Sequence, residues 1–321
     1  MTASGSMITD VHAHHFSREL LGFLGRAGIP LAAGRGALRT RSPIPMLPFE
    51  ARLPMMAEAG VGRQILSSAL CAYALDPALG REGARLVNDE LARFCADRRE
   101  QFSFWAALPL PHVEPSLAEI ARAFDELGAL GVILHCSCLG DSIARAEFDP
   151  VYAELDRRHA VVFLHPCQDG IGSRALNDWS LTVCAGASFE DTVAALHLIA
   201  RQVPRRFPKL RFIVPHFGGL LPTLLARLDG QMPQDDFAEP PSATARRFFY
   251  DTVGWGSKPA LLAAVAAFGA GQLVPGSDYP VLLPSESYAQ TFAHVREAGL
   301  PESDVDRILY RNAPKLLGLA R

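Results

Sequence analysis

The sequence has no excess of positive charge and no apolar run long enough to cross a membrane. It contains 31 lysine and arginine residues against 34 aspartate and glutamate residues, which gives a net charge of −3. Such a chain has no electrostatic field that would attract a polyanion. No apolar stretch approaches the ~20 residues that a bilayer requires. We therefore expect neither nucleic acid nor a membrane among its partners.

Cysteine is also sparse, with six residues in a chain of 321. These cysteines lie in mostly apolar segments and lack the density that is typical of a disulfide-stabilised scaffold. The first ten residues, MTASGSMITD, have neither the basic segment nor the apolar segment of a signal peptide. We therefore expect reduced thiols and a cytoplasmic location.

Apolar residues make up 49% of the chain, which is enough to bury a sizeable core and excludes disorder as the main state. Short runs rich in Val, Ile and Phe alternate with longer segments in which apolar residues recur at helical spacing. The predicted strands are residues 7–14, 63–68, 102–109, 131–136, 160–165, 211–216, 248–253 and 272–277. The predicted helices are residues 49–59, 83–98, 114–127, 150–158, 189–203, 220–228, 259–268, 285–297 and 302–317.

This alternation of strands and helices predicts the fold. Right-handed crossovers between successive strands give a parallel sheet with helices on its faces. Eight such units in one chain favour an α/β protein built as a closed (β/α)8 TIM barrel, with residues 1–321 as one domain. Residues 16–47 form a Gly-, Pro- and Arg-rich segment after the first strand, and a loop of this length is usually functional. We expect it to form a lid over the C-terminal end of the barrel.

Histidines and carboxylates gather at the C-terminal ends of the predicted strands, where barrel enzymes place their active sites. These residues are Asp10, His12, His14, His165, His216 and Asp278. Because side chains alternate along a strand, Asp10, His12 and His14 are expected to share one face, the barrel interior. One such histidine would more often be a buried structural residue. An HxH pair with His165 and Asp278 at other strand ends instead favours a site for a divalent cation such as Zn²⁺.

The motifs that surround these residues resemble a known family. DVHAHH, FLHP, PHFGG, GSDYP and RNAPKLLGL are similar to segments of the amidohydrolase-related family. The similarity is to the branch of aminocarboxymuconate-semialdehyde decarboxylase, with 6-methylsalicylate and γ-resorcylate decarboxylases as relatives. The resemblance implies a metal-dependent, non-oxidative decarboxylase of an aromatic or unsaturated carboxylic acid, without an organic cofactor.

The resemblance also implies roles for individual residues. His12, His14, His165 and Asp278 match the metal ligands, and Asp278 and His216 match catalytic positions. In the family, the histidine at the position of His216 stands beside the metal-bound water as acid or base. Arg227 in LLARLD matches an arginine that binds a substrate carboxylate, in some members from the neighbouring subunit, which implies a homodimer. A second arginine of this kind could be Arg39, Arg41 or Arg52.

The number of metal ions follows from a residue that is missing. Binuclear members of the superfamily carry a carbamylated lysine at the end of a middle strand. The only lysines here are Lys209, Lys258 and Lys315, and none lies at such a position. The resemblance therefore implies one divalent ion, for which we expect Zn²⁺, with Mn²⁺ as the alternative.

Other assignments stay open at this point. Trp179 and Phe217 either stack on a planar substrate or belong to the core, because aromatic side chains are common in both places. The same metal ligands would also serve a hydrolase of a lactone or an amide, with the metal-bound water as nucleophile. A non-catalytic metal-binding barrel is a third reading, although it would not need His216. A fold does not by itself determine which of these functions is present.

Overall fold

The computed structural model describes residues 7–15, 18–27, 49–68, 73–167, 169–232 and 237–319. Most of the predicted lid lies outside these residues, so its position over the barrel stays a prediction. Within the lid, residues Arg18–Arg26 form helix α1, which packs on α4 (Pro77–Ala96). Among the described helices, none is both long and apolar enough to cross a membrane.

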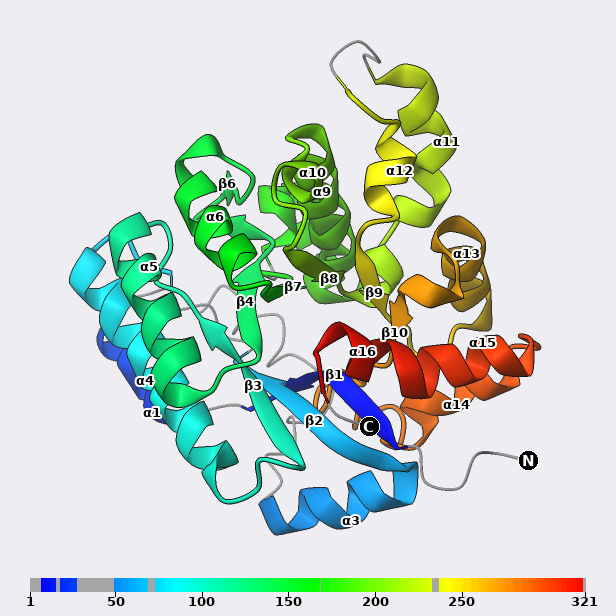
Figure 1. Ribbon diagram of the computed structural model, residues 1–321, viewed down its shortest axis with the longest axis horizontal. Helices are drawn as coiled ribbons and strands as arrows, with labels where there is room; N and C mark the ends of the chain where they lie inside the picture. The colour runs from blue at the N-terminus through cyan, green and yellow to red at the C-terminus, as the bar shows by residue number, and fades with distance from the viewer. Residues whose placement is uncertain are drawn as a thin grey trace.

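Eight strands form one sheet in the order β1-β2-β3-β4-β7-β8-β9-β10, and every neighbouring pair in it is parallel. Figure 1 shows these strands at the centre of the molecule with the helices around them. The strands are β1 (Ile8–His14), β2 (Val61–Ser67), β3 (Phe102–Ala107), β4 (Gly131–His135), β7 (Val161–His165), β8 (Arg211–Val214), β9 (Phe249–Asp251) and β10 (Leu273–Val274). The predicted (β/α)8 barrel is confirmed.

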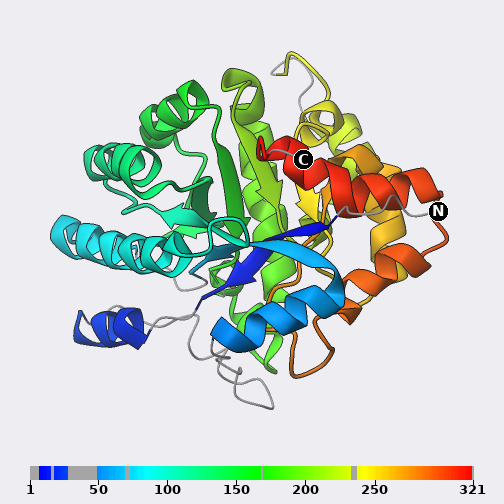
Figure 2. The same ribbon diagram turned by 60° about the horizontal axis from the view of Figure 1, so that its bottom comes forward.

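Helices cover the outside of the barrel, as the two views in Figures 1 and 2 show. Besides α1 and α4, the α-helices are α3 (Phe49–Ala59), α5 (Val113–Arg122), α6 (Asp149–Arg157), α7 (Arg174–Asn177), α8 (Leu181–Cys184), α9 (Gly186–Ala200), α10 (Val203–Arg206), α11 (Leu221–Gln231), α12 (Pro241–Ala245), α13 (Lys258–Phe268), α14 (Gln290–Glu297), α15 (Glu302–Asp306) and α16 (Asn312–Leu316). Helix α4 begins earlier than predicted because Pro77 follows the N-cap Asp76, whose carboxylate accepts the N–H groups of Ala78 and Leu79.

The barrel closes where β1 meets the segment that follows β10, and we call this junction the β1/β10 seam. Val11 N–H donates to the Pro275 carbonyl at 2.9 Å, and Asp278 N–H donates to the His12 carbonyl at 2.8 Å. A further parallel bridge joins Ala13 to Tyr279. Strand β10 ends at Val274, three residues earlier than predicted, since Pro275 has no N–H to donate to a ladder.

Two apolar clusters hold this architecture together. The smaller one fills the barrel with side chains that point inward from the strands, and Ala313 from α16 closes it. Its buried members are Val11, Ile65, Trp105, Ile133, Val161, Phe163, Ile213, Val274 and Ala313. The larger cluster lies between the strands and the surrounding helices. Because the interior is packed, the open end of the barrel is left for polar side chains.

Local features that were not predicted include a hairpin and a π-helical turn. Residues 137–142 form a short antiparallel hairpin of β5 (Ser137–Cys138) and β6 (Asp141–Ser142), whose turn residues Leu139 and Gly140 both have positive φ. The helix predicted at 302–317 is divided by a π-helical turn over Arg307–Arg311. Neither feature moves a residue of the predicted metal site.

Candidate active site

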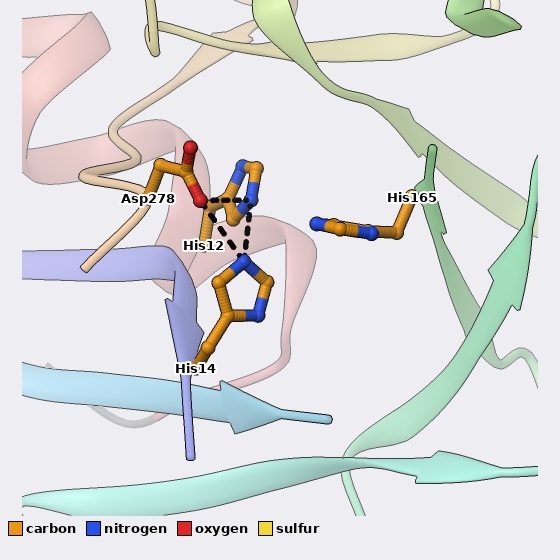
Figure 3. A group of neighbouring side chains, drawn as sticks. All are labelled: His12, His14, His165 and Asp278. Atoms are coloured by element: carbon orange, nitrogen blue, oxygen red, sulfur yellow. Dashed lines mark hydrogen bonds and ion pairs between the residues drawn. The ribbon is translucent and has the colours of Figure 1, made fainter. Parts of the chain in front are cut away.

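The four predicted metal ligands lie together at the C-terminal end of the barrel. One nitrogen or oxygen atom from each of His12, His14, His165 and Asp278 lies within 4.8 Å of the others, and all four residues are buried. His14 Nε2 is 3.0 Å from Asp278 Oδ1 and 3.1 Å from His12 Nε2. Figure 3 shows these three side chains grouped on one side, with His165 pointing toward them from the opposite wall. Two strand ends and the β1/β10 seam therefore supply the site.

The second ring nitrogen of each histidine is held by the protein. His12 Nδ1 lies 2.7 Å from Asp251 Oδ2, and His14 Nδ1 lies 2.9 Å from Ser67 Oγ. His165 Nδ1–H donates to the Pro166 carbonyl at 3.0 Å. A carbonyl or carboxylate partner requires the hydrogen on Nδ1, which leaves the Nε2 lone pair free. The rings of His12 and His165 are thus fixed in the tautomer that a metal ligand needs. The Ser67 hydroxyl donates to the Ala13 carbonyl at 3.4 Å, so it can accept the Nδ1 hydrogen of His14.

The donor set and its spacing fit a divalent cation. His12 Nε2 and Asp278 Oδ1 are 3.3 Å apart. Two ligands at about 2.0–2.1 Å from a tetrahedral ion would be about 3.3–3.4 Å apart. Burial lowers the pKa of His165 well below its usual value, which keeps this imidazole neutral. Burial would raise the pKa of Asp278, but a proton on His12 keeps it well below normal; burial would lower the pKa of His12, but Asp251 and Asp278 raise it to about 10. A bound cation would take the place of this proton. Neutral imidazoles and an ionised carboxylate are the forms that bind Zn²⁺ or Mn²⁺.

An irregularity in β1 corrects one prediction about these side chains. The register with β2 shifts between Asp10 and Ala13, so the strict alternation of faces fails there. The ring of His12 lies against Phe163 of the barrel interior, whereas Asp10 accepts hydrogen bonds from Gln64 and Tyr288 on the outer side of the sheet. Asp10 therefore does not share a face with His12 and His14, and it is not a ligand.

Asp10 instead connects the two sides of the β1/β10 seam. Its carboxylate accepts both the N–H and the hydroxyl of Ser277, at 3.1 and 2.6 Å, and it also accepts the N–H of His12. Burial raises the pKa of Asp10 to about 6. This carboxylate ties the backbone of one ligand, His12, to the residue that precedes another, Asp278.

His216 stands directly after β8, beside the four ligands. Its ring centroid is 5.4 Å from that of His12. Its Nδ1 lies 2.8 Å from Asp191 Oδ2, and its backbone N–H donates to Asp251 Oδ1 at 2.8 Å. Burial would lower the pKa of His216, but the Asp191 carboxylate outweighs this effect and raises it. His216 and Asp278 both have φ of 53°, an uncommon conformation for residues with a side chain that often occurs at functional sites.

Two buried carboxylates of this network, Asp191 and Asp251, were not predicted from the sequence. Asp251 ends β9 and bonds to both His12 and the backbone of His216. A carboxylate at the end of a predicted strand was an available signal. Asp191 follows Glu190 inside α9, and acidic residues in the middle of a helix carry no signal of burial.

The structure does not bring every predicted substrate-binding residue to the metal ligands. Arg227 is exposed on α11, and among the described residues its Nε donates to Gln231 Oε1 at 3.0 Å. Trp179 is 92% exposed between α7 and α8. Phe217 is buried and packs against Gly254 and His294, so its ring belongs to the core. Arg227 and Trp179 stay predictions that a single chain leaves open.

Of the three candidates for a second carboxylate-binding arginine, Arg39 and Arg41 lie outside the described residues. Arg52 is buried on α3, where it donates to the His14 carbonyl at 2.9 Å and to Gln64 Oε1 at 3.4 Å. Its guanidinium also lies 4.4 Å from the ring centroid of Tyr279. Arg52 supports the backbone of a metal ligand, and its terminal nitrogens already have partners.

The three lysines are placed as the sequence indicates. Lys209 precedes β8, Lys258 pairs with Glu297 at 3.0 Å, and Lys315 lies in α16. None lies at the C-terminal end of a barrel strand. In the described part of the chain, the four ligands form the one group of His, Cys, Asp or Glu residues spaced to hold a metal ion.

The fold and the site define a (β/α)8 barrel with a three-histidine, one-aspartate metal centre at its C-terminal end. The chain belongs to the amidohydrolase family, which matches it over residues 9–319. The resemblance predicted from the motifs is thereby confirmed.

The chain is also similar to individual proteins whose activity is named. Over 286 residues the chain is 29% identical to the 6-methylsalicylic acid decarboxylase of Penicillium expansum, covering 84% of each protein. Over 278 residues it is 24% identical to the 2-amino-3-carboxymuconate-6-semialdehyde decarboxylase of Dictyostelium discoideum, covering 84% of this chain and 76% of the relative. A similar fold occurs in the crystal structure of a dihydroxybenzoic acid decarboxylase from Polaromonas sp. with bound manganese and the inhibitor 2-nitroresorcinol. That comparison has a TM-score of 0.81 and 22% identity, and it covers 99% of this chain and 98% of the other.

Proposed function

We propose that the protein is a metal-dependent, non-oxidative decarboxylase of an aromatic or unsaturated carboxylic acid. The observation that carries the proposal is the placement of His216 beside the four-ligand centre, with its pKa raised by Asp191. The similarity to decarboxylases of 6-methylsalicylic acid and aminocarboxymuconate semialdehyde supports the same reaction class.

The reaction needs a proton at a defined carbon. When CO₂ leaves an sp² carbon, the electrons of the broken bond need an acceptor, and prior protonation of that carbon provides one. A histidine whose pKa is raised by a carboxylate is protonated to a greater extent near neutral pH than a free imidazole, and it can donate that proton. His216 would supply this proton from Nε2, since Nδ1 is engaged by Asp191.

The metal site would bind and orient the oxygen atoms of the substrate. His12, His14, His165 and Asp278 would hold one divalent ion, and this ion would supply Lewis acidity when bound. Three imidazoles and one carboxylate favour Zn²⁺. The manganese in the Polaromonas structure makes Mn²⁺ the alternative. The catalytic role proposed for Asp278 is to hold the carbon that is protonated close to His216.

Substrate recognition is proposed to involve a second copy of the chain. Arg227 is exposed and has no ion pair within the described residues, so its planar guanidinium can bind a carboxylate through two parallel hydrogen bonds. Apolar side chains are exposed on the neighbouring segments: Trp179 is 92% exposed, Leu220 39% and Phe189 36%. Burial of these side chains in a homodimer would bring Arg227 to the partner's active site and give Trp179 a planar surface to contact.

The cellular setting is part of the same proposal. The cysteines within the described residues are all free thiols, as expected for a reducing compartment. We therefore infer a cytoplasmic enzyme, and its localisation can be tested by fractionation of the source cells.

The function can be tested with purified protein loaded separately with Zn²⁺ or Mn²⁺. The substrates are a panel of hydroxybenzoates, carboxymuconates and lactones, and the assay follows CO₂ release and ring opening in parallel. We expect CO₂ from one class of carboxylate and a large loss in His216→Asn, with its metal retained. Lactone hydrolysis without CO₂ release would show a hydrolase instead, and no turnover with either metal would contradict the proposal.

A further inference from the structure

One ring nitrogen of His216 is hydrogen-bonded to the buried carboxylate of Asp191. Asp191 Oδ2 lies 2.8 Å from His216 Nδ1, and the side chain of Asp191 is fully buried. It is the sixth residue of α9 and lies inside the helix, so it does not cap the helix. Its hydrogen-bonding partners, His216 and Cys136, come from other elements of the barrel. Asp191 therefore acts on the ends of the strands and not on its own helix.

The other oxygen of this carboxylate is also occupied. Cys136 Sγ–H donates to Asp191 Oδ1 at 3.4 Å, and Cys136 is buried where β4 ends. Burial and the neighbouring Asp191 charge raise the pKa of the Cys136 thiol well above its usual value, so this sulfur keeps its hydrogen and remains a donor. With one donor on each oxygen, the plane of the carboxylate is fixed between β4 and the residue that follows β8.

This arrangement leaves one ring nitrogen of His216 available. Because a carboxylate only accepts hydrogen bonds, the hydrogen facing Asp191 must be on Nδ1. Within the described residues, Nε2 of His216 has no hydrogen-bonding partner, and 18% of the side chain is exposed. The backbone of His216 is fixed independently, through its N–H to Asp251.

We propose that Asp191 is a positioning residue, which fixes the ring orientation and the Nδ1–H tautomer of His216 so that Nε2 faces the metal centre. The chemical consequence rests on the proposed function, in which His216 transfers a proton. The structural part does not, because the tautomer of His216 can be observed without turnover. Cys136 contributes to the same arrangement by holding the far oxygen of Asp191.

The cost of burying the Asp191 carboxylate favours a positioning role over a role in packing alone. A buried carboxylate costs several kcal/mol unless hydrogen bonds and a charged partner compensate it, and an apolar side chain at the same place would avoid that cost. In other enzymes, a carboxylate that orients a histidine contributes through the tautomer it imposes, and its removal lowers turnover by up to ~10⁴-fold. General acid–base catalysis as a whole contributes about 10²–10⁴-fold.

The test uses Asp191→Ala and Asp191→Asn in the full-length, metal-loaded protein. Thr192→Val is the matched control, since Thr192 is the next buried residue of α9 and bonds to Ser188 and Leu220 rather than to His216. We expect Asp191→Ala to lower kcat by about 10²–10⁴-fold, with KM within about twofold and unchanged metal content. Asp191→Asn should also lower kcat, because an amide whose NH₂ faces Nδ1 imposes the Nε2–H tautomer. Thr192→Val should keep the wild-type kcat.

The second readout is ¹⁵N NMR of histidine in the Zn²⁺-loaded protein, with the His216 signals assigned by their absence in His216→Asn. At a pH above the pKa of His216, where the ring is neutral, we expect Nδ1 of His216 to carry the hydrogen in the wild type and the Nε2–H form to appear in Asp191→Ala. An unchanged tautomer, or an equal loss of kcat in Thr192→Val, would overturn the positioning role. Absence of decarboxylation in the wild type with the expected NMR result would contradict the proposed function alone.

Discussion

Replacing Asp251 with asparagine should weaken metal binding, although Asp251 is not itself a ligand. Asp251 Oδ1 accepts two backbone N–H groups, from His216 at 2.8 Å and from Val253 at 3.1 Å. Its Oδ2 accepts the hydrogen of His12 Nδ1 at 2.7 Å. An asparagine has only one oxygen, and it cannot satisfy three donors that approach from two sides.

The two possible orientations of the new amide are both unfavourable. If its oxygen stays with the two backbone groups, its NH₂ faces His12 and forces the hydrogen onto Nε2, the ligand atom. If the amide turns over, its NH₂ opposes two N–H groups in a buried site, which costs about 1–3 kcal/mol. Loss of such an orienting partner typically costs 10–100-fold in metal affinity, which corresponds to about 1.4–2.7 kcal/mol.

The dissociation constant for Zn²⁺ can be measured by competition with a chromophoric chelator. Asp156→Asn is a suitable control, because Asp156 Oδ1 also accepts two backbone N–H groups, from Lys209 and Leu210, and its carboxylate bonds to no histidine ring. This control should lower the melting temperature and leave the dissociation constant unchanged. Equal affinities in Asp251→Asn and the wild type would refute the reasoning, since His12 would then not depend on Asp251 for its tautomer.

The other predictions concern the site residues themselves. His12→Ala and Asp278→Ala should each lose the metal, and elemental analysis of the wild type should give one ion per chain; two ions would contradict the site described. His216→Asn should retain the metal and lose about 10²-fold or more in kcat, and a loss of metal instead would make His216 a ligand. Because the pKa of His216 is raised above 6.5 and the proposed reaction needs its protonated form, kcat should stay high through pH 6.5 and fall at higher pH; a fall below 6.5 would contradict this role. Arg227→Lys should lower kcat/KM without changing metal content, and mixing Arg227→Ala with His216→Asn chains should restore activity if the arginine acts across a dimer; a strictly monomeric protein would exclude that arrangement.

The sequence was sufficient to predict the barrel and its metal ligands because both depend on strongly patterned features. Strands and helices alternate with clear apolar periods, and the HxH pair, His165 and Asp278 each follow an apolar strand. In a parallel barrel the ends of all strands lie at the same end of the molecule, so residues far apart in sequence converge there. The burial of all four ligands follows from this topology alone.

The parts that could not be predicted depend on local irregularity or on tertiary contacts. The register shift in β1 turns Asp10 outward, and no residue in DVHAHH signals it. Asp191 has the spacing of an ordinary helical residue, and only the packing of α9 on the segment after β8 brings it to His216. The role of Arg227 depends on a second chain, which the pattern of one sequence does not place.

The position of the metal ligands at the β1/β10 seam has a consequence for how the protein is made. His12 and His14 lie on β1, the first strand of the barrel, whereas Asp278 follows β10, the last strand. Synthesis proceeds from the N-terminus, so the two histidines are made before all the other strands of the barrel and before their carboxylate partner. We therefore expect metal loading to be a late event, which follows release of the last strand and accompanies closure of the ring.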